Sequence, residues 1–130
     1  MKLQKRSDNR INVNFGKVTL EAEVLQTSEE RRLGLMYRDG LEKNSCALFK
    51  FPELDYIGMW MKNVSFPLAT AFVEEIENGK YKIASIQKMQ PDGGNNIYRS
   101  PKRVKLVVEA NVDFFEKNNI KEGDDVIFEQ

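Results

Sequence analysis

The chain has 130 residues, a hydrophobic fraction of 41% and 20 basic against 20 acidic side chains, so its formal net charge is zero. This length allows one domain with its own core, and the charge balance disfavours nucleic acid as a partner, because nucleic-acid-binding proteins usually carry a clustered basic excess. The sequence contains no histidine and one cysteine, which excludes Ser-His-Asp and Cys-His catalysis, an intrachain disulfide and zinc sites built from these residues.

The first ten residues are polar and basic, and no apolar run follows them. We therefore expect residues 1–10 to form a flexible leader and residues 11–130 to form a single domain. A secretory signal needs an apolar stretch of roughly 7–15 residues, and a membrane span needs about 20. The sequence as written thus predicts no membrane association and a cytoplasmic protein, exported only if a leader was removed.

The first elements are predicted from the alternation of apolar and polar residues and from a helix-capping motif. Residues 11–15 and 18–24 both alternate apolar and polar side chains, which is typical of half-buried strands, and their separation by a glycine-containing turn predicts a hairpin. Thr27 and Glu30 then have the spacing of a capping box. This spacing predicts a short helix over residues 28–36.

Most of the remaining chain is predicted to be β. The asparagine-glycine pair at 78–79 is a strong hairpin signal, and a short second helix is expected to begin at Asp113. The first strand of this part is expected to stop at Pro52. The predicted strands are residues 47–51, 57–61, 68–73, 81–86, 104–108 and 125–129. Roughly eight strands and two short helices favour a mainly β sandwich or closed barrel over a helical bundle.

An ordered set of short motifs resembles the signature of the DUF192 family of uncharacterised proteins. The set comprises Arg31, residues 34–38 (GLMYR), residues 48–51 (LFKF) and residues 60–63 (WMKN). Weaker matches extend the resemblance over residues 13–128. It implies a jelly-roll-like β-sandwich or barrel with two short helices at its ends, and it implies no activity, because the family has no settled function.

Four positions depart from what is usual in the family. An aspartate normally follows the Pro-Leu pair, and a threonine normally follows Lys-Asn; this chain has Ala69 and Val64 there. Cys46 and Asp113 stand where glycines are usual. If the aspartate and threonine are working polar groups in the family, their loss here weakens a catalytic interpretation.

The most unusual local cluster is residues 60–63. A strand would place Trp60 and Lys62 on one face and Asn63 on the other. One interpretation is that a sugar or other polar ligand stacks on Trp60 and is held by Lys62 and an arginine. The alternative is that Trp60 fills the core and the Lys62 stem covers it.

Arg31 and Arg38 are seven residues apart, about two helical turns, so they could share a helix face. Either arginine could pair with Glu109, a carboxylate that follows an apolar strand, and this pair would order the fold. Alternatively, Arg31, Arg38 and Lys62 could form a pocket for an anion.

Two functional hypotheses follow, and a purely structural or interaction role is the third possibility. The first is a non-catalytic binding or accessory domain for a small polar, anionic or carbohydrate ligand or for a protein partner. The second is a carbohydrate-active hydrolase or lyase that uses Glu109 with Lys62 or an arginine. No cofactor and no metal site are expected, and the oligomeric state is left open. The candidate binding residues are Arg31, Arg38, Trp60, Lys62, Asn63 and Glu109.

Overall fold

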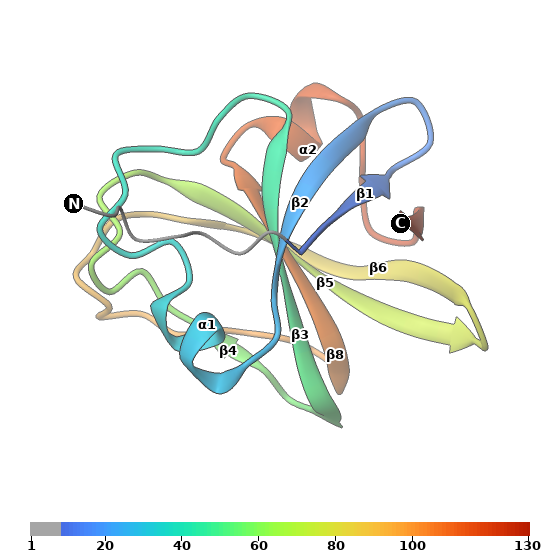
Figure 1. Ribbon diagram of the computed structural model, residues 1–130, viewed down its shortest axis with the longest axis horizontal. Helices are drawn as coiled ribbons and strands as arrows, with labels where there is room; N and C mark the ends of the chain where they lie inside the picture. The colour runs from blue at the N-terminus through green and yellow to red at the C-terminus, as the bar shows by residue number, and fades with distance from the viewer. Residues whose placement is uncertain (1–8) are drawn as a thin grey trace.

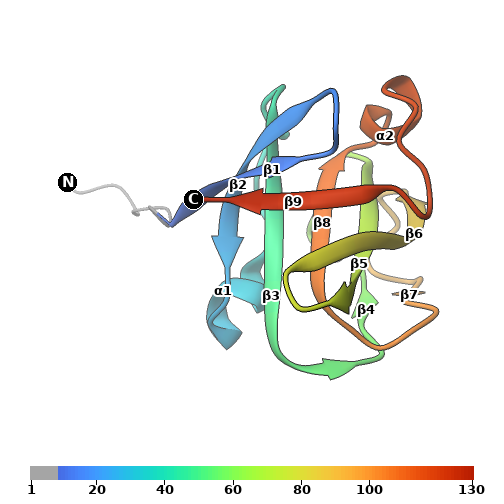
Figure 2. The same cartoon turned by 90° about the vertical axis from the view of Figure 1, so that its right-hand side faces the viewer.

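The structure is a computed structural model that describes residues 9–130. Within these residues seven strands close into a barrel in the order β1-β2-β3-β8-β5-β6-β9 (Figure 2). The barrel strands are β1 (Arg10–Asn14), β2 (Thr19–Leu25), β3 (Ser45–Asp55), β5 (Leu68–Glu77), β6 (Lys80–Met89), β8 (Val104–Asn111) and β9 (Asp125–Glu129). A separate two-stranded sheet is formed by β4 (Gly58–Met59) and β7 (Tyr98–Arg99).

This architecture confirms the mainly β prediction and makes it specific as a closed barrel. The β1–β2 and β5–β6 pairs are antiparallel hairpins, as their sequences predict. β2 and β3 are paired in parallel, with α1 (Ser28–Leu33) in the connection between them. The jelly-roll part of the expectation is not confirmed by this strand order.

Several predicted strands have different lengths in the structure, and the pairing of the strands explains two of these differences, at β3 and β4. β3 continues past Pro52 to Asp55, and its pairing with β8 breaks between Lys50 and Asp55. Proline is tolerated at such a break because no ladder hydrogen bond is required from it. The strand expected over residues 57–61 is only two residues long, because β4 pairs with the short β7 and not with the barrel.

The barrel wall separates two apolar clusters. Alternate residues of the strands fill the interior, among them Val13, Leu48, Ala69, Ile83 and Val108. Intervening residues of β3, β5, β6 and β8 face outward and contribute to a second buried cluster. α1 and β4 lie together on one side of the barrel, away from α2 (Phe114–Lys117) (Figure 1). Residues that follow α1 and flank β4 pack into the second cluster and so help to cover the outer face of the barrel.

The expected leader lies outside the described residues except for Asn9 and Arg10, and Arg10 already belongs to β1. α1 ends at Leu33, three residues before the predicted end. Across residues 9–130, neither helix has the length and apolar character needed to cross a membrane.

Candidate functional site

A cavity of about 300 Å³ lies beside α1, where the helix and the segment after β4 meet β3 and β8. We call it the α1 cavity. Its apolar lining includes Leu35, Phe49, Phe51, Met59 and Val64. Its other side chains include Ser28, Arg31, Arg32, Trp60, Lys62 and Glu109. Four of the six predicted site residues, far apart in the sequence, therefore line one cavity.

Glu109 is the buried acid of the α1 cavity. It lies in β8, opposite Ala47 of β3 and Thr70 of β5, and it is 4% exposed. No described residue forms a hydrogen bond or ion pair with its carboxyl group, so the expected pair with Arg31 or Arg38 does not form. Burial raises the pKa of Glu109 from 4.5 to about 8, because the charged form is poorly solvated there. Near neutral pH this carboxyl therefore carries a hydrogen that it can donate.

Glu109 belongs to a row of residues that crosses four strands on the outer face of the barrel. Glu23 of β2 is opposite Ala47, Ala47 is opposite Glu109, and Glu109 is opposite Thr70. All four are buried. The Thr70 hydroxyl oxygen has no hydrogen-bond partner among the described residues. Two polar groups without a partner among residues 9–130 thus lie side by side on β8 and β5.

α1 is positioned by its caps. The Thr27 hydroxyl accepts a hydrogen bond from the Glu30 amide, and the Glu30 carboxylate accepts one from the Thr27 amide, both at 3.0 Å. The predicted capping box is therefore confirmed. Gly34 ends the helix with φ +50°, and a Cβ atom there would lie 3.4 Å from the Phe49 ring. A Cβ atom would thus be in ordinary contact with the ring, and glycine is favoured here by the positive φ and not by lack of space.

The two arginines of α1 have different surroundings. The Arg31 guanidinium donates to the carbonyl oxygens of Gln26 and Lys50, the latter at 3.1 Å, and lies 5.0 Å from the centre of the Phe51 ring. Arg31 is therefore fixed in the cavity wall. Arg32 is exposed and forms no hydrogen bond or ion pair within residues 9–130. Sequence reasoning missed Arg32, although its position next to Arg31 in the same short helix was the available signal.

Trp60 and Lys62 lie together at the opening of the cavity. Trp60 is 44% exposed, so the interpretation that it fills the core is wrong. The Lys62 ammonium lies 5.2 Å from the centre of the Trp60 ring. Gly94 packs against both side chains: a Cβ atom added to it would lie 3.0 Å from Lys62 Cβ and 3.3 Å from the Trp60 ring. Asp92 holds this loop by accepting a hydrogen bond from the Gly94 amide at 2.9 Å.

Arg38 and Asn63 lie outside the α1 cavity and have other partners. Arg38 donates two hydrogen bonds to the carboxylate of Glu23. The helix ends before Arg38, so Arg31 and Arg38 do not share a helix face. Asn63 donates from its side chain to the Tyr37 hydroxyl at 2.9 Å and accepts from the Tyr37 amide through its backbone carbonyl. These contacts connect the turn after α1 to β2 and to the segment after β4.

The four departures from the family pattern lie in three places. Val64 lines the α1 cavity, so a methyl group stands where a hydroxyl is usual. Cys46 and Ala69 are buried in the barrel interior, and burial raises the pKa of the Cys46 thiol to about 12, which makes it a weak nucleophile. Asp113 precedes α2 without forming a side-chain cap.

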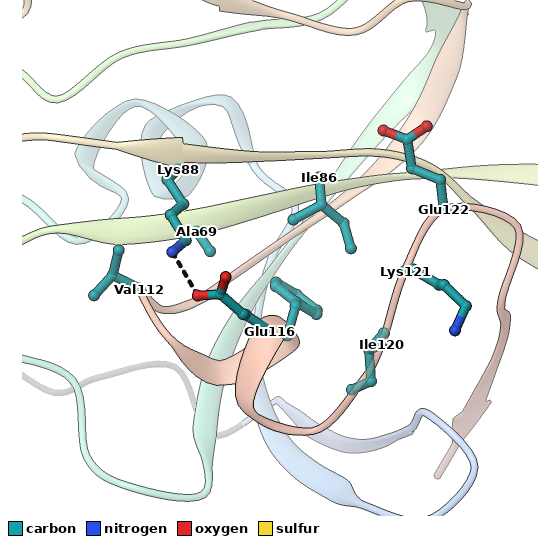
Figure 3. A pocket seen from close by; sticks show the side chains of 9 residues that line it. Ala69, Ile86, Lys88, Val112, Glu116, Ile120, Lys121 and Glu122 are labelled. Carbon is teal, nitrogen blue, oxygen red and sulfur yellow. Dashed lines mark hydrogen bonds and ion pairs between the residues drawn. The ribbon is translucent and has the colours of Figure 1, made fainter.

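A larger cavity of about 510 Å³ lies between α2 and the strands β5 and β6 (Figure 3). Ala69, Ile86 and Phe115 contribute to its mainly apolar lining. Lys88 and Glu116 at this cavity pair with each other at 2.8 Å, so their charges are neutralised locally (Figure 3). The α1 cavity is the better candidate for a polar ligand, because its lining includes a buried carboxyl group, that of Glu109, without a partner among the described residues. Residues 9–130 contain no group of three or more acidic or cysteine side chains placed to hold a metal ion.

Comparisons with known proteins agree with this fold. The model of the DUF192 family, described as uncharacterised, matches residues 10–128. A crystal structure of a candidate transcription regulator from Sinorhizobium meliloti 1021 is 26% identical, with a TM-score of 0.84 over 96% of this chain and 98% of that chain. A protein of unknown function from Novosphingobium aromaticivorans DSM 12444 is 24% identical, with a TM-score of 0.79 over 90% and 82% of the two chains, and shows the fold alone. No curated protein matches the chain.

Proposed function

This chain belongs to the DUF192 family, and we propose that it is a non-catalytic binding domain that takes a small anionic ligand in the α1 cavity. The observation that carries the proposal is the buried carboxyl of Glu109, which lines this cavity without a partner among the described residues. A buried polar group normally has a hydrogen-bond partner. A ligand that fills the cavity would supply the missing one.

The charges around the cavity favour an anion. Arg31, Arg32 and Lys62 line it, and Glu109 is its one acid among the described residues. Because the pKa of Glu109 is raised to about 8, this acid is mostly uncharged near neutral pH and does not offset the three cations. The volume of about 300 Å³ is at the lower end of the range for ligand sites, which favours a small molecule.

The number of free carboxyl groups favours a binding function over a sugar-cleaving one. Glycoside hydrolysis usually requires two carboxyl groups on either side of the scissile bond. The α1 cavity contains Glu109 alone among described acids. The other buried acid of the same row, Glu23, is held by both terminal nitrogens of Arg38. The second carboxyl that a hydrolase would need is therefore engaged in an ion pair.

A thermal-shift experiment tests the proposal. The panel contains phosphate, citrate, D-glucuronate, D-glucose and a short DNA duplex, the last because of the description of the Sinorhizobium protein. A ligand at 100 times its dissociation constant stabilises the folded state by about 2.7 kcal/mol, which raises the melting temperature visibly. We expect at least one small anion to do so.

Two variants and a control locate the binding. Lys62→Ala and Trp60→Ala should abolish the shift while leaving the protein folded. Lys80→Ala is the matched control, because Lys80 is an exposed lysine at the start of β6. The turn between β5 and β6 lies far from α1 (Figure 1). The absence of a shift with every small anion, or a shift that persists in both cavity variants, would reject the α1 cavity as the binding site.

A further inference from the structure

The two ends of the α1 cavity offer different chemistry. Glu109 is 4% exposed and lies on the barrel wall, whereas Arg32 and Lys62 are exposed side chains at the surface. Trp60, with 44% of its surface exposed, lies beside Lys62. A ligand that contacts all of these groups must therefore have an anionic end, a body that packs on an aromatic ring, and a second polar group that reaches inward.

Glu109 is the one acid among the described residues that line the α1 cavity. The cavity-lining side chains with charge come from α1, which supplies Arg31 and Arg32, and from the segment after β4, which supplies Lys62. On the strands beside Glu109, the residues directly opposite are the uncharged Ala47 and Thr70.

The other buried acid on this face of the barrel is already engaged by an arginine. Glu23 is two strands away from Glu109, and its carboxylate is bound by Arg38. The group at the inner end of the cavity is therefore a single carboxyl, held apart from the other buried acid.

We propose that the ligand of the α1 cavity is an acidic monosaccharide, whose carboxylate is bound by Arg32 and Lys62, whose ring packs on Trp60, and one of whose hydroxyl oxygens accepts a hydrogen bond from the protonated carboxyl of Glu109. This inference rests on the proposed function, because it assigns a ligand class to the same cavity. A sugar ring has weakly polar faces that suit an aromatic side chain and hydroxyl groups at its edge. A simple anion such as phosphate or acetate satisfies the cations but gives no hydrogen bond to Glu109 by a hydroxyl group and does not cover the exposed part of the Trp60 ring.

Binding should then depend on pH in a defined direction. The pKa of Glu109 is raised to about 8, so at lower pH the carboxyl is an uncharged donor. At higher pH the carboxyl group loses its hydrogen and can no longer donate a hydrogen bond. Its negative charge then also repels the acidic ligand. The affinity for the ligand should therefore be constant below about pH 7 and should fall by up to about tenfold per pH unit above pH 8.

Titration calorimetry with D-glucuronate at about pH 6, 7 and 9 tests the inference, with D-glucose, acetate and phosphate as comparison ligands. The wild-type protein should bind D-glucuronate more tightly than any comparison ligand and should lose at least about fivefold in affinity between pH 7 and 9. Glu109→Gln keeps an N–H donor at the same place and cannot ionise, so its affinity for D-glucuronate should not fall between pH 7 and pH 9. Circular dichroism confirms that the variant is folded.

The outcomes separate this inference from the proposed function. Binding of phosphate or acetate as tight as that of D-glucuronate, with no change in pH dependence in Glu109→Gln, would overturn the sugar assignment and leave the anion-binding function standing. Loss of binding in folded Glu109→Gln would also overturn it, because a donor alone would then be insufficient. Failure of every anion in the panel to bind would overturn both proposals.

Discussion

Arg38 and Glu23 form a two-point ion pair that fastens the turn after α1 to β2. The two terminal nitrogens of Arg38 lie 2.9 and 3.1 Å from the two carboxylate oxygens of Glu23. Glu23 is 4% exposed, and Arg38 is partly buried. Paired hydrogen bonds of this kind combine charge with a fixed geometry and are among the strongest that side chains form. The pair therefore helps to position the segment that leads from α1 to β3.

Arg38→Ala should destabilise the protein strongly, because it removes two hydrogen bonds and a positive charge from the buried Glu23 carboxylate. We expect a loss of about 3 kcal/mol in the free energy of unfolding, measured by urea denaturation. Arg32→Ala is the control, since Arg32 is exposed and should change the stability by less than about 0.5 kcal/mol. Equal stabilities of the two variants would show that the ion pair contributes little to the fold.

Glu109 should make the protein less stable as the pH rises. Its pKa is 4.5 when unperturbed and is raised to about 8 in the folded state. Between these values the folded state binds more protons than the unfolded state, so the free energy of unfolding decreases with increasing pH, by about 1.4 kcal/mol per pH unit at most. Below 4.5 this contribution is fully present, and above about 8 it has been lost.

Glu109→Gln isolates this effect, because all other titrating groups cancel in the comparison with the wild type. The variant and the wild type should have similar pH dependence below about pH 4, and the variant should gain relative stability steadily up to about pH 8. Denaturation curves recorded across this range provide the measurement. Parallel pH profiles would show that Glu109 titrates normally in the folded state.

Gly94→Ala should displace the side chains at the opening of the α1 cavity. Gly94 has φ +90°, and a Cβ atom would lie 3.0 Å from Lys62 Cβ and 3.3 Å from the Trp60 ring. Gly93→Ala is a matched control, because Gly93 also has a positive φ, +70°, and nothing lies within 4 Å of its Cβ position. Both variants should lose about 1 kcal/mol from backbone strain.

The displacement itself is measured by fluorescence. Trp60 is the only tryptophan in the sequence, so the emission spectrum reports this one position. We expect the emission maximum to shift in Gly94→Ala and to remain unchanged in Gly93→Ala. The same spectrum for both variants would mean that the loop moves aside without disturbing Trp60.

Thr70→Val should stabilise the protein slightly. The Thr70 hydroxyl is buried and has no partner among the described residues, and an unsatisfied buried group of this kind costs about 1–3 kcal/mol. Valine has nearly the same shape, so we expect a gain of about 1 kcal/mol in thermal or urea denaturation.

Ser100→Ala should change the stability of the protein in the opposite direction. The Ser100 hydroxyl accepts a hydrogen bond from the Ile57 amide at 2.9 Å in a buried setting, so its removal should cost about 1 kcal/mol or more. A loss of similar size in Thr70→Val would indicate that the Thr70 hydroxyl has a partner in solution.

Much of the local structure could be predicted from the sequence. The capping box at Thr27 and Glu30, the hairpin turn at residues 78–79 and the alternating strands depend on residues close together in the chain. Their hydrogen bonds and their period of two act over a few residues, so they leave a direct pattern in the sequence. Errors arose where an element depends on a distant partner. β4 is short because it pairs with β7, and β3 continues past Pro52 because its pairing with β8 breaks there.

The candidate site was only partly accessible to the same reasoning. The sequence by itself determined that Arg31, Trp60, Lys62 and Glu109 are chemically unusual in their local settings. The tertiary structure decided that these four side chains line one cavity, that Arg38 pairs with Glu23, and that no charged side chain within residues 9–130 pairs with Glu109. The reason is strand register. The alternation of apolar and polar residues along a strand indicates which residues share a face. The order and register of the strands in the barrel decide which side chains become neighbours.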